Sequence, residues 1–519
     1  MNSSTRSCSP SFVVVTLLGI ILTLLSPGAE GFAQSEDDQQ AWLRALNSLS
    51  SERMLADVQT LSSPAFSGRQ AGSEDDLRSA NWVGDQFRAS KIGLAYVPLD
   101  RLNVLPGAKV NPRTGFMSKP FQTVIIAPEP TLQISTARIP DNQRLGTDFL
   151  PVLDSPSAHA RAPIVFVGYG IVDIAADMND YAGIDVNNCI VLFLRGKPEH
   201  FKGAITHADK VRIARQKGAV GYLTATGTVL SSYEKRRGVT GQPSAFYGLS
   251  PTSDNLPGAW ISSSRAVQII AGADHSNQER LRNLQEQLNR TSGSRSFLTE
   301  YFGALEWESW QEQGSLINVI AVLPGTDPQL THEAIVIGAH RDHFGRQAGL
   351  LFPGADDNAS GTAVMLEVAR VLTKAGAYPA RTILFISFSG EEQDLVGSRL
   401  YVERPVVPLA LTRTMINIDH AGVGNGRLTV GLTGLEKNVA VEAGQTAGLT
   451  DKLDLYGFFP GGDHVPFKEA GIPTIAVVSA GVHPHFHQPT DTTDTINPEI
   501  LQTVARYVLA LTWQLANVQ

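Results

Sequence analysis

The sequence contains little cysteine and no cluster of basic residues. Among its 519 residues, only Cys8 and Cys189 are cysteines. Lys and Arg number 42 against 50 Asp and Glu, a formal net charge of −8, and no run of Lys or Arg offers a surface to a phosphate backbone. We therefore expect no nucleic-acid partner. The 42% of hydrophobic and 18% of charged residues exclude a disordered or collagen-like chain and indicate a globular protein.

Long hydrophobic runs are also scarce, and the clear one lies near the N-terminus. Arg6 precedes an apolar segment from Phe12 to Leu25, and the small residues Ala29 and Ala33 follow it. This pattern is typical of a signal peptide, so we predict that residues 1–33 are cleaved off. The run is shorter than the roughly 20 apolar residues that span a bilayer, although an uncleaved anchor is the alternative.

Cleavage would leave Cys189 as the sole cysteine, which excludes an internal disulfide. No later segment reaches membrane-spanning length. An exported protein without disulfides suggests a bacterial periplasm or exterior. We therefore expect an exported protein, periplasmic or extracellular, with no membrane span after signal cleavage.

Hydrophobic periodicity predicts an α/β domain that is divided in the sequence. Residues 34–149 begin with apolar residues at helical spacing between 40 and 61. From residue 316 onward strands and helices alternate, as in a doubly wound sheet, with a helix at 361–375 and a strand at 382–388. Sheets of this kind bind their ligands beyond the carboxyl ends of the strands.

The middle segment, residues 150–295, has a different pattern. Apolar strands end in glycine turns at 163–170 and 190–198, and a helix that stops at Gly218 leads directly into a strand at 220–224. The segment resembles a protease-associated (PA) domain, a small β-rich fold inserted in secreted and vacuolar peptidases. A generic α/β insertion is the alternative. Capping of a site, control of substrate length and oligomerisation are all open as its role.

Polar residues with metal-binding side chains follow the predicted C-terminal strands. They lie in five segments: Gly338–His343, Gly354–Gly361, Ser389–Gln393, Asn417–His420 and His483–Pro489. Each motif alone has an ordinary structural explanation, such as a helix cap or a solvated acidic pair. Eight of the twelve histidines lie after residue 330, however, and the carboxylates all follow apolar strands. Zinc binds imidazole nitrogen and carboxylate oxygen, so two histidines and three carboxylates suffice for a two-metal hydrolytic site.

The five motifs and their order resemble the M28 family of co-catalytic zinc peptidases, which includes secreted aminopeptidases. The resemblance covers about residues 40–150 and 300–519 and is interrupted by the PA-like segment. It implies a zinc-exopeptidase fold, with a mixed, largely parallel sheet between two helical layers, and two zinc ions as cofactors. The expected domains are a signal peptide (1–33), the first part of the peptidase domain (34–149), the PA-like insert (150–295) and the catalytic part (296–519).

The resemblance also implies a role for each residue of the site. The implied metal ligands are His340 and Asp419 for one zinc, Glu392 and His487 for the other, and Asp356 as the bridging carboxylate. Asp342 would orient His340, and the peptide bond after Asp356 is expected to be cis. Glu391, next to a ligand but not one itself, would be the general base. Structural or supporting roles are expected for His343, His420, His464, His483 and His485.

The implied activity is the hydrolysis of peptide bonds by an aminopeptidase that releases N-terminal residues from peptide or protein substrates. The alternatives are a carboxypeptidase or dipeptidase of the same fold, a glutaminyl-cyclase-like acyltransferase and a non-catalytic binding protein. One position departs from the family. Some relatives have a Tyr donor shortly before an Asp-His pair, whereas Phe459 stands four residues before Asp463, so Tyr456 or His464 would have to replace that donor.

Overall fold

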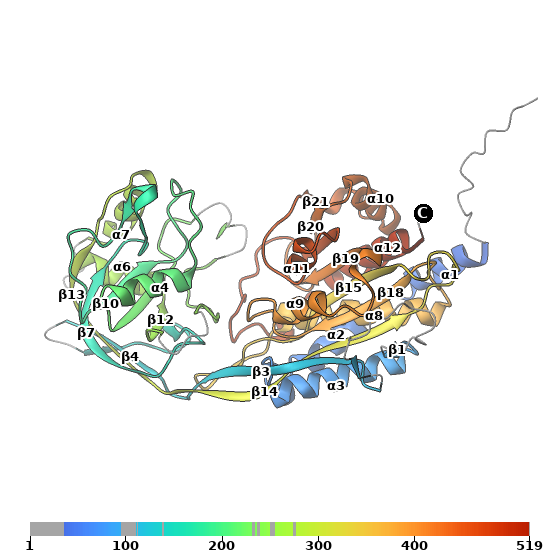
Figure 1. Ribbon diagram of the computed structural model, residues 1–519, viewed down its shortest axis with the longest axis horizontal. Coiled ribbons are helices and arrows are strands. Elements are labelled where there is room, and N and C mark those ends of the chain that lie inside the picture. The colour runs from blue at the N-terminus through green and yellow to red at the C-terminus, as the bar shows by residue number, and fades with distance from the viewer. Residues whose placement is uncertain are drawn as a thin grey trace, which may run out of the picture.

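The computed structural model of the protein describes residues 36–94, 110–111, 113–136, 140–230, 234–235, 239–249, 255–272 and 277–517. The predicted signal peptide lies outside these residues. No helix within them combines the length and the apolar character needed to cross a membrane. The described chain forms a ten-stranded and an eight-stranded sheet, which lie at opposite ends of the molecule (Figure 1).

The ten-stranded sheet is mixed, with parallel strands at its centre. The parallel neighbours, in spatial order, are β18 (Thr382–Phe388), β15 (Ala334–His340), β19 (Thr412–Asp419) and β22 (Thr474–Ser479). The flanking strands are β1 (Gly93–Leu94), β2 (Val110–Asn111), β3 (Phe116–Ile126) and β14 (Ser309–Leu323) on one side, and β20 (Leu428–Thr433) and β21 (Leu453–Tyr456) on the other. The carboxyl ends of the four central strands therefore meet at one edge.

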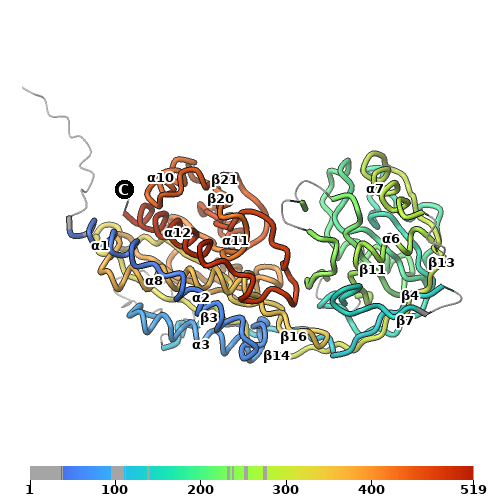
Figure 2. Tube along the Cα trace, turned by 180° about the vertical axis from the view of Figure 1, so that it is seen from behind, coloured from blue at the N-terminus to red at the C-terminus, as the bar shows by residue number. Residues whose placement is uncertain are grey.

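Helices cover both faces of this sheet. One face carries α1 (Glu36–Asn47), α2 (Ser51–Leu61), α3 (Glu74–Ala89), α8 (Gly361–Ala375), α10 (Lys437–Ala447) and α12 (Pro498–Asn517), several of which are seen from behind in Figure 2. The other face carries α9 (Val396–Glu403) and α11 (His464–Glu469). Strand side chains alternate between the two layers: Ile335 and Ile337 pack on the first, and Val336 packs on the second. Because both faces are covered, every residue of β15 and β18 is buried.

Local sequence signals account for several element ends. The bounds of α8 and β18 are those predicted from the sequence. At the start of α3, the Ser73 hydroxyl accepts a hydrogen bond from the Asp76 N–H at 3.2 Å. At the start of α12, Asn497 Oδ1 accepts one from the Glu499 N–H at 2.8 Å. These side chains satisfy N–H groups that have no partner within the helix.

The eight-stranded sheet belongs to a large insertion between β3 and β14. Its strands are β4 (Thr131–Ser135), β5 (Pro140–Asn142), β6 (Phe149–Pro151), β7 (Ala158–Phe166), β10 (Ile190–Leu194), β11 (Gly221–Ala225), β12 (Gly258–Ile261) and β13 (Phe297–Trp307). Some strands of this sheet lie outside the residues expected for the insert, 150–295. We therefore define residues 127–308 as the insert. Strands β3 and β14 pair along their length and connect the insert to the ten-stranded sheet (Figure 1).

The insert has its own parallel centre. Strands β7, β10, β11 and β12 are parallel neighbours in this order. The helices α4 (His207–Gln216), α6 (Ser263–Ala271) and α7 (Arg280–Arg290) pack on the sheet through their apolar faces. The remaining short strands are β8 (Val172–Asp173) with β9 (Met178–Asn179) in the insert, and β16 (Gly345–Gln347) with β17 (Leu350–Phe352) outside it.

Glu333 forms a buried ion-pair cluster at the amino end of β15. Its Oε2 accepts a hydrogen bond from Arg381 Nε at 2.7 Å, and Arg413 donates to its Oε1. Hydrogen bonds from Arg413, and then from Arg381, outweigh desolvation and hold the pKa of Glu333 at about 2, below its ordinary value of 4.5. The cluster joins the beginnings of β15, β18 and β19.

We predict that Glu333→Gln lowers the free energy of unfolding by about 1–2 kcal/mol at pH 7. A carboxylate with a depressed pKa stabilises the fold above its unfolded pKa and loses that contribution as the pH falls. The difference from the wild type should therefore shrink between pH 4.5 and pH 2. Denaturant unfolding over a pH series measures it, with Glu403→Gln, an exposed glutamate, as the control. A difference that does not change with pH would contradict the prediction.

Candidate active site

The loops after the four central strands converge at the carboxyl edge of the ten-stranded sheet. β15 ends at His340 and β19 ends at Asp419, while Glu392 follows β18 and His487 lies in the loop after β22. These side chains are far apart in the sequence and come together because parallel strands share this edge. The structure thus brings together four of the five predicted metal ligands.

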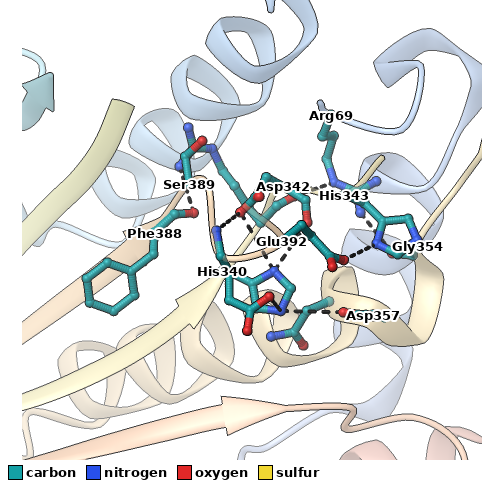
Figure 3. Close-up of polar contacts among 12 residues, drawn as sticks. Arg69, His340, Asp342, His343, Gly354, Asp357, Phe388, Ser389 and Glu392 are labelled. Atoms are coloured by element: carbon teal, nitrogen blue, oxygen red, sulfur yellow. Dashed lines mark hydrogen bonds and ion pairs between the residues drawn. The ribbon is translucent and has the colours of Figure 1, made fainter. Parts of the chain in front are cut away.

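Asp357 lies between His340 and His487, and Figure 3 shows its contact with His340. Its Oδ1 is 3.4 Å from His340 Nε2, and its Oδ2 is 3.0 Å from His487 Nε2. A further carboxylate stands on each side: Asp419 Oδ1 is 3.4 Å from His340 Nε2, and Glu392 Oε2 is 3.4 Å from His487 Nε2. Two ligand atoms bound at about 2.0–2.2 Å to one tetrahedral zinc ion are about 3.4 Å apart. In each set, the distances from the histidine to its two carboxylates are therefore close to those of ligands on one zinc ion.

The electrostatic environment of the group also suits a cation. Burial raises the pKa of Glu391 to about 8 and that of Glu392 well above its ordinary value, because neighbouring acidic groups add to the cost of desolvation. Oδ1 of Asp419 is buried and has no hydrogen-bond partner among the described residues. A divalent cation satisfies such oxygens, and imidazole and carboxylate are the donors that zinc accepts.

The position between the two histidines belongs to Asp357, which corrects the prediction made for Asp356. The Asp356 carboxylate faces away from them: its Oδ2 is hydrogen-bonded with His483 Nδ1 at 2.6 Å, and its Oδ1 accepts from the Gly422 N–H at 2.8 Å. The cis peptide bond also lies one residue later than expected, between Asp357 and Asn358. Adjacent side chains leave the backbone in different directions, and the motif Asp-Asp-Asn alone does not say which carboxylate faces the site.

Backbone carbonyls orient both imidazoles. Nδ1 of His487 lies 2.8 Å from the carbonyl oxygen of Ala245, and Nδ1 of His340 lies 3.2 Å from that of Asp342. A carbonyl only accepts hydrogen bonds, so each ring carries a proton on Nδ1, and Nε2, which faces Asp357, is the ring atom that a metal ion would bind. Ala245 belongs to the insert. The insert therefore takes part in the site by orienting His487.

The Asp342 carboxylate has a different contact from the one expected. Its Oδ1 is 3.7 Å from His340 Nδ1 and accepts a hydrogen bond from the Glu391 N–H at 3.3 Å. The backbone carbonyl of Asp342 orients His340 instead, while its side chain holds the backbone at Glu391. Glu391 Oε2 then lies 4.0 Å from His340 Nε2, whereas Glu392 turns toward His487. The two adjacent glutamates diverge, as expected for a base and a ligand.

The other histidines have separate partners. His343 Nδ1 lies 2.7 Å from Glu392 Oε1 and supports that carboxylate, and His420 Nδ1 lies 3.3 Å from Asp356 Oδ2. His485 is hydrogen-bonded with Thr490. Of the two expected substitutes for the missing tyrosine, His464 directs Nε2 at the Phe459 carbonyl oxygen, 3.1 Å away, and Tyr456 is 46% exposed on β21.

Two buried residues that the sequence analysis did not single out hold the ligand loops in place. Asp491 accepts hydrogen bonds from the N–H groups of Asp356 and Asp357 at 2.9 and 3.1 Å. Arg69 lies before α3 and is labelled in Figure 3. It donates hydrogen bonds of 2.6–2.8 Å to the backbone carbonyl oxygens of Arg341, in the loop after β15, and of Pro353 and Gly354, in the loop after β17. Neither residue lies in a motif, and the contacts depend on tertiary packing, so no local signal indicated them.

Comparison with known sequences relates this site to a peptidase family. Residues 318–512 match the profile of peptidase family M28. Aminopeptidase YwaD from Bacillus subtilis is 35% identical over 174 residues, which cover 31% of this chain and 38% of that protein. A probable leucine aminopeptidase from Arthroderma otae is 30% identical over 213 residues, which cover 38% of this chain and 57% of that protein. The match thus spans less than two thirds of these curated relatives.

Comparison with solved structures covers nearly the whole chain. An aminopeptidase from Aneurinibacillus sp. strain AM-1 has a TM-score of 0.63 and 25% sequence identity, and the match covers 93% of this chain and 97% of that one. The zinc aminopeptidase BSAP from Bacillus subtilis has a TM-score of 0.57 at 21% identity, with 90% and 95% covered, and shares the fold. Both matches extend over the insert as well as the ten-stranded sheet.

We predict that Asp357→Asn strongly reduces zinc binding, because the substitution removes the carboxylate that faces both histidines. Asp356→Asn makes the same change at the preceding residue, whose carboxylate faces away from the two histidines, so this variant should keep its zinc. Equilibrium dialysis followed by metal analysis of the wild type and both variants measures the bound zinc. Loss of zinc in Asp356→Asn with retention in Asp357→Asn would reverse the assignment.

Proposed function

We propose, on the premise that residues 318–512 of this chain form a peptidase family M28 domain, that the protein is a two-zinc aminopeptidase. Its substrates are peptides or proteins with a free N-terminus, from which it releases single residues. The observation that carries this proposal is the position of Asp357 between two histidines, each with its own second carboxylate, at zinc-like spacing. The aminopeptidases among the sequence and structural relatives support the choice of reaction.

In this proposal the residues of the chain have distinct tasks. One zinc would be held by His340, Asp357 and Asp419, and the other by Asp357, Glu392 and His487. Bound zinc ions supply Lewis acidity and bring the pKa of a water molecule toward neutrality. The carbonyls of Ala245 and Asp342 hold the proton of each imidazole on Nδ1, which leaves Nε2 as the atom that would bind zinc.

Glu391 is the general base of the proposed reaction. Its carboxylate lies beside His340, whereas the carboxylate of Glu392 contacts His343 and His487. It would accept a proton from the attacking water at an Oε atom and deliver it to the nitrogen of the leaving amine. The hydrogen bond from its own N–H to Asp342 fixes the backbone from which this side chain extends.

Other expectations remain proposals. We propose that the insert is a PA-like domain, supported by its separate sheet, and that the chain is exported to the periplasm or the exterior. The latter rests on the pattern of residues 1–33.

Peptides with modified ends test the proposed reaction. We expect the zinc-loaded protein to remove single N-terminal residues from short peptides, and this should cease when the N-terminus is acetylated and continue when the C-terminus is amidated. Mass spectrometry of the products measures this. Cleavage that requires a free carboxylate would indicate a carboxypeptidase instead, and cyclisation of an N-terminal glutamine would indicate the acyltransferase.

A substitution at Glu391 tests the general base. Glu391→Gln should keep its zinc and lose turnover by roughly 10²–10⁴-fold, since the amide cannot accept the proton. Asp394→Asn, which removes a charge from an exposed residue of the same loop, serves as the control and should keep turnover. Metal analysis and initial rates with a leucyl peptide give the two readouts. Normal turnover in Glu391→Gln would rule out the assigned base.

A further inference from the structure

A cavity of about 570 Å³ lies where the insert meets the loop after β22. On the insert side, Tyr169, Arg195 and Thr226 follow the parallel strands β7, β10 and β11, and each lines the cavity. His483, Phe486 and His487 line it from the other side. The cavity thus lies at the carboxyl ends of parallel strands, where α/β sheets bind ligands, and its volume is typical of small-molecule sites.

The cavity adjoins the proposed metal centre directly. His487 contributes to the cavity wall while its Nε2 faces Asp357. Four hydrogen bonds attach the insert at this point. Ala245 pairs with His487 through its N–H and its carbonyl oxygen, at 3.0 and 2.8 Å, and Gln488 Nε2 donates to the Pro243 carbonyl oxygen and to Ser244 Oγ, both at 2.8 Å. A molecule held at the metal centre could therefore extend into the cavity past His487.

Arg195 presents an unused donor in this cavity. Its backbone is fixed by a hydrogen bond from its N–H to the Ala225 carbonyl oxygen at 2.8 Å. Its guanidinium carbon lies 3.7 Å from the ring centre of Trp260 and 4.4 Å from that of Phe246, so the group is stacked on aromatic faces. Nη1 is buried and has no hydrogen-bond partner among the described residues. Such a donor is costly unless a ligand supplies the acceptor.

Other cations near the site have their partners within the protein. Arg69 and Arg341 donate to backbone carbonyl oxygens. Lys197, which lines the same cavity as Arg195, directs Nζ to the Gly203 carbonyl oxygen at 2.6 Å. The Arg195 guanidinium is different because aromatic stacking fixes its plane and leaves its N–H edge for an acceptor. A planar guanidinium edge matches a carboxylate, to which it can donate two parallel hydrogen bonds.

We propose that Arg195 binds a substrate carboxylate on the leaving-group side of the cleaved bond. This rests on the proposed aminopeptidase function, which holds the free amino end of the substrate at the metal centre and directs the rest of the chain away from it. The carboxylate is that of a short peptide, supplied either by its C-terminus or by an acidic side chain. The enzyme is accordingly a peptidase for short peptides that carry this group, and Arg195 determines that specificity.

The test compares peptides that differ only in one carboxylate. With the zinc-loaded full chain, we expect kcat/KM for Leu-Gly-Gly to exceed that for Leu-Gly-Gly-amide by at least about tenfold, mainly through KM, because a hydrogen bond to a charged group is involved. In Arg195→Met, which keeps an unbranched side chain but removes the guanidinium, the ratio should fall close to one. Arg195→Lys should fall between them, since Lys lacks the planar edge. Lys197→Met removes a charge from the same cavity and should keep the wild-type ratio.

A second pair of peptides identifies the source of the carboxylate. If Leu-Asp-Gly-amide is preferred over Leu-Asn-Gly-amide, and Arg195→Met abolishes this preference, an acidic side chain is the ligand. If the preference appears only with the first pair, the C-terminus is the ligand. The proposal is overturned if neither pair shows a preference in the wild type or if the preference survives in Arg195→Met.

The outcomes also separate this proposal from the proposed function. Release of leucine from the amidated peptides without a carboxylate preference would leave the aminopeptidase intact and remove the role of Arg195. No cleavage of any of the peptides by the wild type would contradict the aminopeptidase itself. Thermal unfolding of each variant verifies folding, and if Arg195→Met does not fold, the ratio measured for Arg195→Lys decides.

Discussion

The burial of many carboxylates at one edge of a sheet is the constraint on which this structure depends. Asp342, Asp356, Asp357 and Asp463 are all nearly inaccessible to solvent, and an unpaired buried carboxylate is strongly unfavourable. The partners of these carboxylates come from different parts of the chain. Backbone N–H groups donate hydrogen bonds to Asp342 and Asp356, and histidine side chains contact Asp356 and Asp357. Asp419 Oδ1, which lies 3.4 Å from His340 Nε2, has no hydrogen-bond partner among the described residues. A bound cation would satisfy this oxygen.

Much of this site follows from the sequence because the strand ends have local signals and the alternation of strands with helices predicts that the strands are parallel. A strand that ends in His340, and another that ends in Asp419, deliver their side chains to the same edge once the strands are parallel. The sequence could not distinguish Asp356 from Asp357, since adjacent side chains point in different directions and only the folded backbone decides which one faces the histidines. Arg69 and Asp491 were inaccessible to sequence reasoning for another reason: their contacts exist only after distant segments pack together.

The insert is more than an appendage to the ten-stranded sheet. Its strands extend beyond the boundaries that the sequence pattern indicated, because β4 and β5 lie before residue 150 and β13 lies after residue 295. The carboxyl ends of its parallel strands face the loop that carries His487, so two α/β-type sheets contribute their ligand-binding edges to one place. Arg195 and the metal-facing residues occupy the two sides of this junction.

The hydrogen bond between the Ala245 carbonyl oxygen and His487 joins residues that are 242 positions apart. An ion bound at His487 would therefore act as a non-covalent cross-link between the insert and the ten-stranded sheet. Because a ligand that binds only the native arrangement stabilises it, metal occupancy and the docking of the insert are thermodynamically linked. Removal of the insert would leave His487 without the acceptor that selects its tautomer, and loss of a metal ion bound at His487 would weaken the attachment of the insert.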